Sequence, residues 1–563
     1  MNKNTEIHFS SIPAIDISRS KVDKAHTLLS TWSNGDLIPI FVDEILPGTT
    51  IKMKMSEVIR MTTPIVPVMD NCYQDVMFYF VPYRLLWTHW KQFMGENDTA
   101  PWTQTTQYQI PQIEAPTGGW NVGSLADYLG YPTGVEIKKS ALPFRAYCMI
   151  YNEWWRDENL QNPVYITMGD SDTTGKNYNS LTYDPVTDTE CGAKPLKACK
   201  FHDYFTSALP QSQKGAQVQI PLGDVAPIIG TKDVYSTAIP QVQANMVDKK
   251  LYFLNPTTAG QENNIAAFDE NGANQLGDGK VIGLAADLSS ALGATVTQLR
   301  QSFAIQKFLE RDARGGTRYI ESIFSHFRVT NPDFRMQRPE YLGGKRIPIN
   351  MNQAIQTDAT SWNLMPEWNE DESRYDWSTV NNTPQGNAAA YSVTSDSDED
   401  LFTFSATEHG ILMGLSVCRC DHTYQQGVPR MYSRKNKFDF YFPEFANISE
   451  QFIRNDEIYA QGTSKDEEAF GYQEAWAEYR FMPSRVTGIM RSSASQSLDI
   501  YHYADNYSAL PQLGDEWIRE PEENMARTLA VQDEPQFWGD FYFKPVYTLP
   551  MPLYSVPGLI DHH

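Results

Sequence analysis

Proline recurs so often in this chain that few regular elements can run far without interruption. The 563 residues include 34 prolines, and clusters within 64–67, 101–116 and 545–557 separate short apolar runs. Because proline lacks a backbone N–H, sheets tolerate it mainly at edges, strand starts and turns. The sequence therefore predicts short strands joined by long ordered loops, which favours a β-sandwich or a barrel.

Several segments carry the patterns of individual strands. Ile51, Met53 and Met55 alternate with polar residues, as in a strand that has one wet face. The short apolar or aromatic runs at 75–81, 411–420 and 438–442 predict more deeply buried strands. The sequence thus indicates a mainly β protein.

Helices are expected to be few. Apolar residues spaced three and four apart predict helices at 84–94, which would stop at Gly95, and at 144–154. The clearest pattern is at 289–312, and Gly315-Gly316 would end that helix. No linker-like tract divides the chain, and 41% hydrophobic residues can form a sizeable core, so we expect one large domain over residues 1–563 with insertions.

Charge and cysteine content exclude several classes of protein. The net charge of −23 argues against a protein whose whole surface coats nucleic acid. No apolar run is long enough to cross a bilayer and no export signal is recognisable, so we expect no membrane insertion. Six cysteines in so long a chain are too sparse for a disulfide framework and suit a reducing cytoplasm.

No motif for catalysis or for cofactor binding withstands inspection. Residues 169–176 (GDSDTTGK) resemble a phosphate-binding loop, but the spacing is one residue too long and Asn177 replaces the required Ser or Thr. Cys418 and Cys420 lack the paired spacing of a zinc site and are expected to be reduced and packed. Acidic residues at 396–400 and 515–523 predict solvated loops, for which calcium binding stays open. We expect no enzyme, no cofactor and no metal.

Two basic runs interleave with aromatic residues, one within 194–205 and one within 300–346. Arginine beside aromatic rings is typical of surfaces that bind single-stranded nucleic acid. The alternative is that these cations pair with carboxylates of a neighbouring subunit, and the sequence leaves both open. The candidate residues for a genome-facing surface or a subunit junction are Lys194, Lys197, Lys200, Arg311, Arg314, Arg318, Lys345 and Arg346.

Long, ordered segments carry a family resemblance nearly from end to end. They are 37–48 (LIPIFVDEILPG), 63–71 (TPIVPVMDN), 78–96 (FYFVPYRLLWTHWKQFMGE), 142–161 (LPFRAYCMIYNEWWRDENLQ), 202–215 (HDYFTSALPQSQKG), 310–319 (ERDARGGTRY), 337–344 (QRPEYLGG), 470–480 (FGYQEAWAEYR) and 554–562 (YSVPGLIDH). With these segments the chain resembles the major capsid proteins of microviruses, especially the gokushovirus branch. Departures are local: Gln211-Ser212 stands where relatives tend to carry Trp-Pro, and Arg328 where many carry Gly.

The resemblance implies a fold, an assembly and partners. The fold would be an eight-stranded antiparallel jelly roll of the viral capsid type, with long loop insertions and a few short helices. The assembly would be a homo-oligomeric T=1 icosahedral shell around circular single-stranded DNA, formed in the cytoplasm of a bacterial host and found in the virion. A small basic DNA-binding virion protein, a pilot protein and a host surface receptor would be further partners. The rival hypothesis is a carbohydrate-binding or carbohydrate-active β-sandwich, suggested by 13 Trp and 30 Tyr.

Family-like motifs vanish between about residues 222 and 289. Turn-forming residues crowd this stretch, which is the composition of an excursion rather than of a core strand. We expect 230–290 to be a surface insertion, and relatives with an insertion here imply protrusions on the three-fold axes that recognise the host. The alternative is a loop that only pads the shell. The candidate recognition residues are Asn255, Asn263, Asn271, Gly272 and Gly279.

Overall fold

The computed structural model of the chain describes residues 18–97, 106–216, 218, 296–355 and 388–554, together with 228–231, 251–253, 265–267, 283–286, 357, 360–363, 367–369, 371, 374–376, 379–383 and 386. The chain divides into two compact units, one formed by Met1–Ser212 with Ala313–His563, the other by Gln213–Asp312. Each unit is described by itself.

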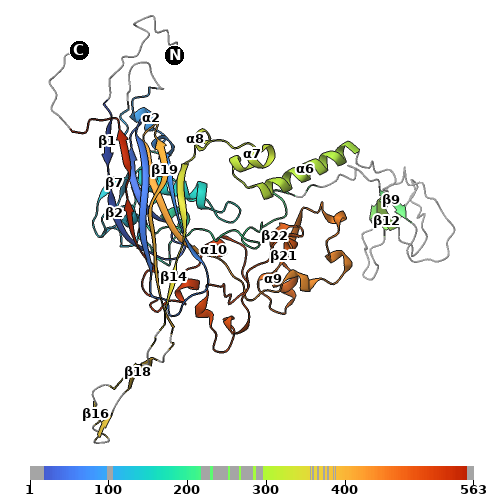
Figure 1. Ribbon diagram of the computed structural model, residues 1–563. Coiled ribbons are helices and arrows are strands. Elements are labelled where there is room, and N and C mark those ends of the chain that lie inside the picture. The colour runs from blue at the N-terminus through green and yellow to red at the C-terminus, as the bar shows by residue number, and fades with distance from the viewer. Residues whose placement is uncertain are drawn as a thin grey trace, which may run out of the picture. The chain divides into compact units, whose positions relative to one another are not determined.

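Two antiparallel sheets form the centre of the first unit (Figure 1). The seven-stranded sheet contains β1 (Ser20–Asp23), β24 (Val546–Leu549), β4 (Thr50–Met61), β19 (Ala388–Ser405) and β14 (Met351–Ile355) in that order, and β23 (Phe537–Phe543) joins β4 to β2 (His26–Trp32). The four-stranded sheet has the order β13 (Glu340–Pro348), β5 (Cys72–Pro82), β20 (Gly410–Cys420) and β3 (Ile38–Ile45).

The main core lies between these two sheets. Ile51, Met53 and Met55 of β4 are fully buried there while Lys52 and Lys54 face outward, so the predicted alternation is confirmed. The same cluster contains Phe78 of β5 and many inward side chains of β20 and β23. The predicted strands at 75–81 and 411–420 are confirmed as parts of β5 and β20.

The four-stranded sheet is buried on both of its faces. On β20, Leu412 and Cys418 belong to the core between the sheets, whereas Met413 and Val417 belong to a second core on the other face. This second core is covered by α4 (Leu142–Ile150), which continues as a π-helix over Tyr151–Trp155. The helix predicted at 144–154 is therefore confirmed, and its aromatic stripe is what covers the sheet.

Two sequence predictions for regular elements are wrong. The helix expected at 84–94 is broken into α1 (Tyr83–Leu86) and α2 (Trp90–Phe93), because Trp87 adopts an extended backbone and its indole donates to Asp170 at 2.6 Å. The strand expected at 438–442 is a turn of 3-10 helix followed by exposed backbone. Its four aromatic side chains are only partly covered and remain 43–65% exposed.

The acidic segments match the predicted solvated loops only in part: Asp400, Glu516 and Glu523 are exposed, but other carboxylates are not. Residues 396–400 lie within the long strand β19, where Asp396 contacts Lys345 at 2.5 Å. In the second segment Glu520 is only 2% exposed. Both carboxylates are held by cations, which offsets the cost of burying a charge.

Smaller elements surround the sheets. The helices are α3 (Leu125–Tyr128), α5 (Pro185–Asp188), α7 (Tyr319–Phe327), α8 (Asp333–Met336), α9 (Asn455–Ile458), α10 (Asp515–Ile518) and α11 (Glu523–Ala526). The strands form small antiparallel pairs of β21 (Glu450–Arg454) with β22 (Ala469–Glu474), β15 (Thr360–Asn363) with β18 (Thr379–Thr383) and β16 (Glu367–Asn369) with β17 (Arg374–Asp376), and a three-stranded sheet of β7 (Lys138–Ser140), β6 (Gln112–Glu114) and β8 (Thr173–Thr174).

The second unit contains the segment 230–290, for which the sequence predicts a surface insertion. Its described strands pair as β9 (Ile228–Thr231) with β12 (Gly283–Ala286) and β10 (Leu251–Phe253) with β11 (Ile265–Ala267). The helix predicted at 289–312 is α6 (Val296–Gly315), and its expected first turns, like the five candidate recognition residues, lie outside the described residues. Where the structure describes helices, none is long and apolar enough to cross a membrane.

Candidate functional site

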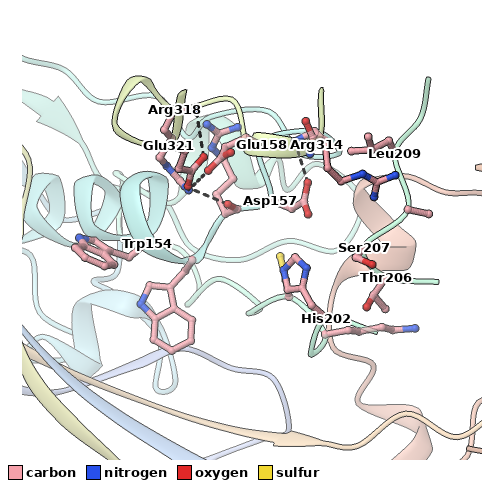
Figure 2. A pocket seen from close by; sticks show the side chains of 18 of the residues that line it. Trp154, Asp157, Glu158, His202, Thr206, Ser207, Leu209, Arg314, Arg318 and Glu321 are labelled. Atoms are coloured by element: carbon pink, nitrogen blue, oxygen red, sulfur yellow. Dashed lines mark hydrogen bonds and ion pairs between the residues drawn. The ribbon is translucent and has the colours of Figure 1, made fainter. Parts of the chain in front are cut away.

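The two basic runs of the sequence meet at one cavity of about 730 Å³ in the first unit (Figure 2). Its walls come from the loop after the π-helix (154–159), the loop 199–209, the segment 313–321 and side chains of the four-stranded sheet. Figure 2 shows Arg318, Glu158 and Glu321 grouped on one side of it. Lys200, Arg314 and Arg318, three of the eight candidate cations, line this cavity.

Arg318 is fixed at the start of α7 by several groups. Its guanidinium contacts Glu158 and lies 3.3 Å from Glu321. It also donates to the backbone carbonyl of Asn152 at 2.6 Å. Burial lowers the pKa of Arg318, but an arginine so placed remains charged at neutral pH. The residue therefore ties α7 to the end of the π-helix.

The other two cavity cations are also paired within the chain. Arg314 contacts Glu450 of β21 and donates to Gln473 of β22 at 2.5 Å. Lys200 lies 3.2 Å from Asp505, and its ammonium stands 4.6 Å from the centre of the Trp517 ring. These charges are partly neutralised before any partner arrives.

On the four-stranded sheet two arginines share one buried carboxylate, and Asp421 lies close enough to interact with one of them. Asp75 of β5 is 1% exposed and contacts both Arg346 of β13 and Arg419 of β20. Both guanidinium groups also contact the ring of Phe201, that of Arg346 at 4.6 Å and that of Arg419 at 4.1 Å from the ring centre. Half of the Arg346 side chain remains exposed. Hydrogen bonding to Asp75 raises the pKa of Arg346. Because Arg346 is half exposed and lies against the Phe201 ring, this cluster can offer a cation and an aromatic face to a phosphate or a base.

Comparison with known proteins identifies capsid proteins as relatives over nearly the whole chain. Residues 10–559 match the model of a family described as "Capsid protein (F protein)". The chain belongs to this capsid protein family. It is 40% identical to capsid protein VP1 of Bdellovibrio phage phiMH2K and 39% identical to that of Spiroplasma virus 4, in each case over 99% of this chain and 98% of the relative. Capsid protein VP1 of Chlamydia phage 1 is 35% identical over 98% of this chain and 97% of its own length.

The remaining candidate cations of this capsid-family chain are dispersed. Lys345 is buried between Glu57, at 2.7 Å, and Asp396, and so joins β13 to the opposite sheet. Lys197 lies 2.9 Å from Asp36. The two others have different surroundings: Lys194 stands 5.1 Å from the centre of the Tyr178 ring, and Arg311 of the second unit is exposed.

Sequence reasoning missed Arg419 and Asp75. The signal was available: in a buried strand with Cys418 and Cys420 on one face, Arg419 must point to the opposite face, where a buried cation requires a carboxylate. All six cysteines are free, and Lys176 of the loop-like 169–176 segment contacts Asp188 at 2.5 Å. No group suited to hold a metal occurs among the described His, Cys, Asp and Glu residues.

Proposed function

We propose that this chain is the major, structural capsid protein of a microvirus, and that it builds a T=1 icosahedral shell around circular single-stranded DNA. The observation that carries the proposal is the match to the capsid family over nearly the whole chain. A mainly β unit with two facing sheets agrees with it.

The strand arrangement supports the jelly-roll part of the proposal. β1 and β2 follow each other along the chain, as do β23 and β24. β1 pairs with β24 and β2 pairs with β23, and both β23 and β24 pair with β4. The larger sheet is therefore four strand positions wide, with β14 beside one end of β19. The smaller sheet also has four strands. Two packed four-stranded layers are the layout of a jelly roll.

The edge strands of the two sheets have features that hinder open-ended strand pairing, as a subunit of a closed shell requires. The edge strand β13 carries a bulge at Tyr341–Gly343, and the edge strand β3 contains Pro39. The edge strand β1 has only four residues. Bulges, proline and short length all prevent open-ended pairing between sheets of different molecules. Such a subunit can associate through its loops without forming fibres.

Electron microscopy of particles purified after expression of the chain tests the shell directly. Uniform closed particles with T=1 symmetry are expected. A stable monomer at micromolar concentration, or glycosidase activity or specific sugar binding of that monomer, would instead favour the carbohydrate-related rival.

We further propose that the Arg346–Arg419–Phe201 cluster contacts the genome and that the other candidate cations mainly hold the subunit together. Arg346→Ala leaves Asp75 paired with Arg419, so the fold should survive. Because phosphate contacts release counterions, Arg346→Ala particles should lose DNA at lower salt than wild type. Lys52→Ala, which removes an equally exposed cation paired with Asp400 on the other sheet, is the matched control. Identical salt profiles for wild type and Arg346→Ala would refute the contact.

The segment 230–290 remains our candidate for host recognition, because long insertions on rigid scaffolds often carry function. Shortening 255–279 should leave particles that assemble but no longer adsorb to the host. Normal adsorption would favour the padding alternative. A small basic DNA-binding protein and a pilot protein are proposed as further virion partners on the family resemblance.

A further inference from the structure

Exposed apolar side chains gather in the segments 431–452 and 479–482, which lead into β21 and follow β22, two strands labelled in Figure 1. We call this set the aromatic surface. Each of its members exposes at least 40% of its area: Met431, Tyr432, Phe438, Phe440, Tyr441, Phe442, Ile448, Phe452, Tyr479 and Met482. Large side chains left open in this number are unusual on a protein that stays alone.

The surface is held in place from beneath. The ring of Phe445 lies 6.0 Å from Phe442 and 6.2 Å from Trp476, and Trp476 in turn lies 5.9 Å from Tyr441. The guanidinium of Arg434 lies 4.4 Å from the centre of the Tyr479 ring. These contacts order the rings before any partner binds, which lowers the entropy lost on association.

A cavity of about 210 Å³ opens beside this surface and shares Met431, Tyr479 and Met482 with it. Its lining combines Tyr204, Phe205 and other apolar side chains with three arginines and two glutamates. An apolar cavity of roughly 150 Å³ suffices for a benzene molecule. This cavity therefore has room for one aromatic or branched aliphatic side chain.

Four of the five charged side chains that line the cavity are paired inside the chain, and the fifth, Arg485, is exposed. Arg430 contacts Glu457 at 2.8 Å, and Arg434 contacts Glu478 at 3.2 Å. Burial raises the pKa of Glu457, although Arg430 opposes this effect. Nucleic acid binds through cations that are available to phosphate. A site with one exposed cation, two paired arginines and many open aromatic rings fits an apolar protein surface better.

We infer that the aromatic surface is a subunit–subunit contact, covered in the shell by a second copy of this chain that inserts an apolar side chain into the cavity beside Tyr204 and Phe205. The inference rests on the proposed shell function and names the surface through which it operates. A pocket filled by an apolar anchor within a ring of aromatic residues is the usual form of an interface hot spot.

The exposed area agrees with this occupant. If a fully exposed side chain of this size contributes about 200 Å², the ten residues leave on the order of 1,000 Å² open. A standard specific interface buries about 800 Å² on each partner, whereas the largest apolar patch of a typical monomer is about 300–600 Å². A second copy can supply the required area, and a small ligand in the cavity cannot.

Accessibility of one engineered thiol tests the contact. Ser484 lines the cavity and is exposed, whereas five of the six natural cysteines are buried. In Ser484→Cys, a maleimide should react at least about tenfold more slowly in particles made from this chain alone than in free subunits. Equal rates in both forms would overturn the inference, because the surface would then face solvent or genome.

A charge on the surface provides the second measurement. Tyr432→Asp adds a carboxylate to a side chain that is 67% exposed, so the subunit should keep its thermal unfolding temperature and yet yield no shells. Leu181→Asp, at a loop position that is 91% exposed, should assemble normally and serves as control. Wild-type shell yield from Tyr432→Asp would refute the contact alone. Absence of shells from the wild-type chain would instead contradict the proposed function.

Discussion

His422 should act as a buried cation that holds the first unit together, and its replacement tests this directly. Its imidazole is 4% exposed and lies 3.0 Å from Glu520 and 3.3 Å from Asp505. Asp505 also contacts Lys200 at 3.2 Å. Two cations and two carboxylates thus share one buried site, so removal of the imidazolium would leave a net negative charge there.

The pKa values give the sign and size of the effect. Burial alone would lower the pKa of His422, but Asp505 and Glu520 outweigh it and raise the pKa from 6.5 to about 10. A raised pKa means that the folded state holds the proton more tightly. The stabilisation is therefore complete below pH 6.5 and is lost as the pH rises toward 10, by about 1.4 kcal/mol for each pH unit and about 5 kcal/mol in total.

The two carboxylates shift in the opposite direction. Burial would raise their pKa values, but Lys200 and His422 lower that of Asp505, and His422 lowers that of Glu520. Their contribution is present above their ordinary pKa values of 3.8 and 4.5 and is lost as the pH falls further. The cluster should therefore be most stabilising between about pH 4.5 and 6.5.

Urea unfolding of free subunits, followed by tryptophan fluorescence, measures the effect. His422→Gln should lower the free energy of unfolding by about 3–5 kcal/mol at pH 6. The difference from wild type should then shrink between pH 7 and 9, below the range where tyrosines titrate. His202→Gln, at an exposed histidine, should leave the curve unchanged. A constant difference across this range would show that His422 is neutral and refute the argument.

Two further predictions concern the sheets. Lys345→Met should lower the free energy of unfolding, measured in urea, by about 3–5 kcal/mol, because Glu57 would stay buried without its cation. The double variant Lys345→Met, Glu57→Gln should recover part of this loss. No recovery would contradict the pairing of the two residues. Gly344→Ala should cost about 1–3 kcal/mol in the same assay, because its new Cβ would lie 2.2 Å from the Val76 carbonyl oxygen. Gly169→Ala, which meets nothing within 4 Å, is the control, and equal effects of both substitutions would refute the steric argument.

The strands that the sequence predicted best are those whose burial depends on local pattern. In β4 the apolar residues alternate with lysines, and in β20 a mainly apolar run, interrupted by Ser416 and Arg419, spans a sheet with a core on both faces. Both patterns follow from where the strand lies in the layers. The break at Trp87 could not be predicted in the same way, because it depends on Asp170, which is distant in sequence.

At the candidate site, too, the sequence predicted local patterns but not the contacts between residues that are distant in sequence. Composition identified two basic runs with interleaved aromatic residues, and Lys200, Arg314 and Arg318 do line one cavity. Charge composition could not reveal which carboxylate each cation meets, since those partners lie far away in the chain. Lys345 is the clearest case: it was a candidate for genome contact, and the fold places it between Glu57 and Asp396.

The failed strand at 438–442 has a different physical cause. The run of Phe438, Phe440, Tyr441 and Phe442 has the composition of a buried strand, because burial of aromatic side chains is strongly favourable. The same free energy is available whether the covering atoms come from this chain or from a neighbour. A single sequence therefore records that these rings are to be buried but not by which molecule. In a chain built for a shell, aromatic runs that lack the alternation or length of a strand are the first places to look for subunit contacts.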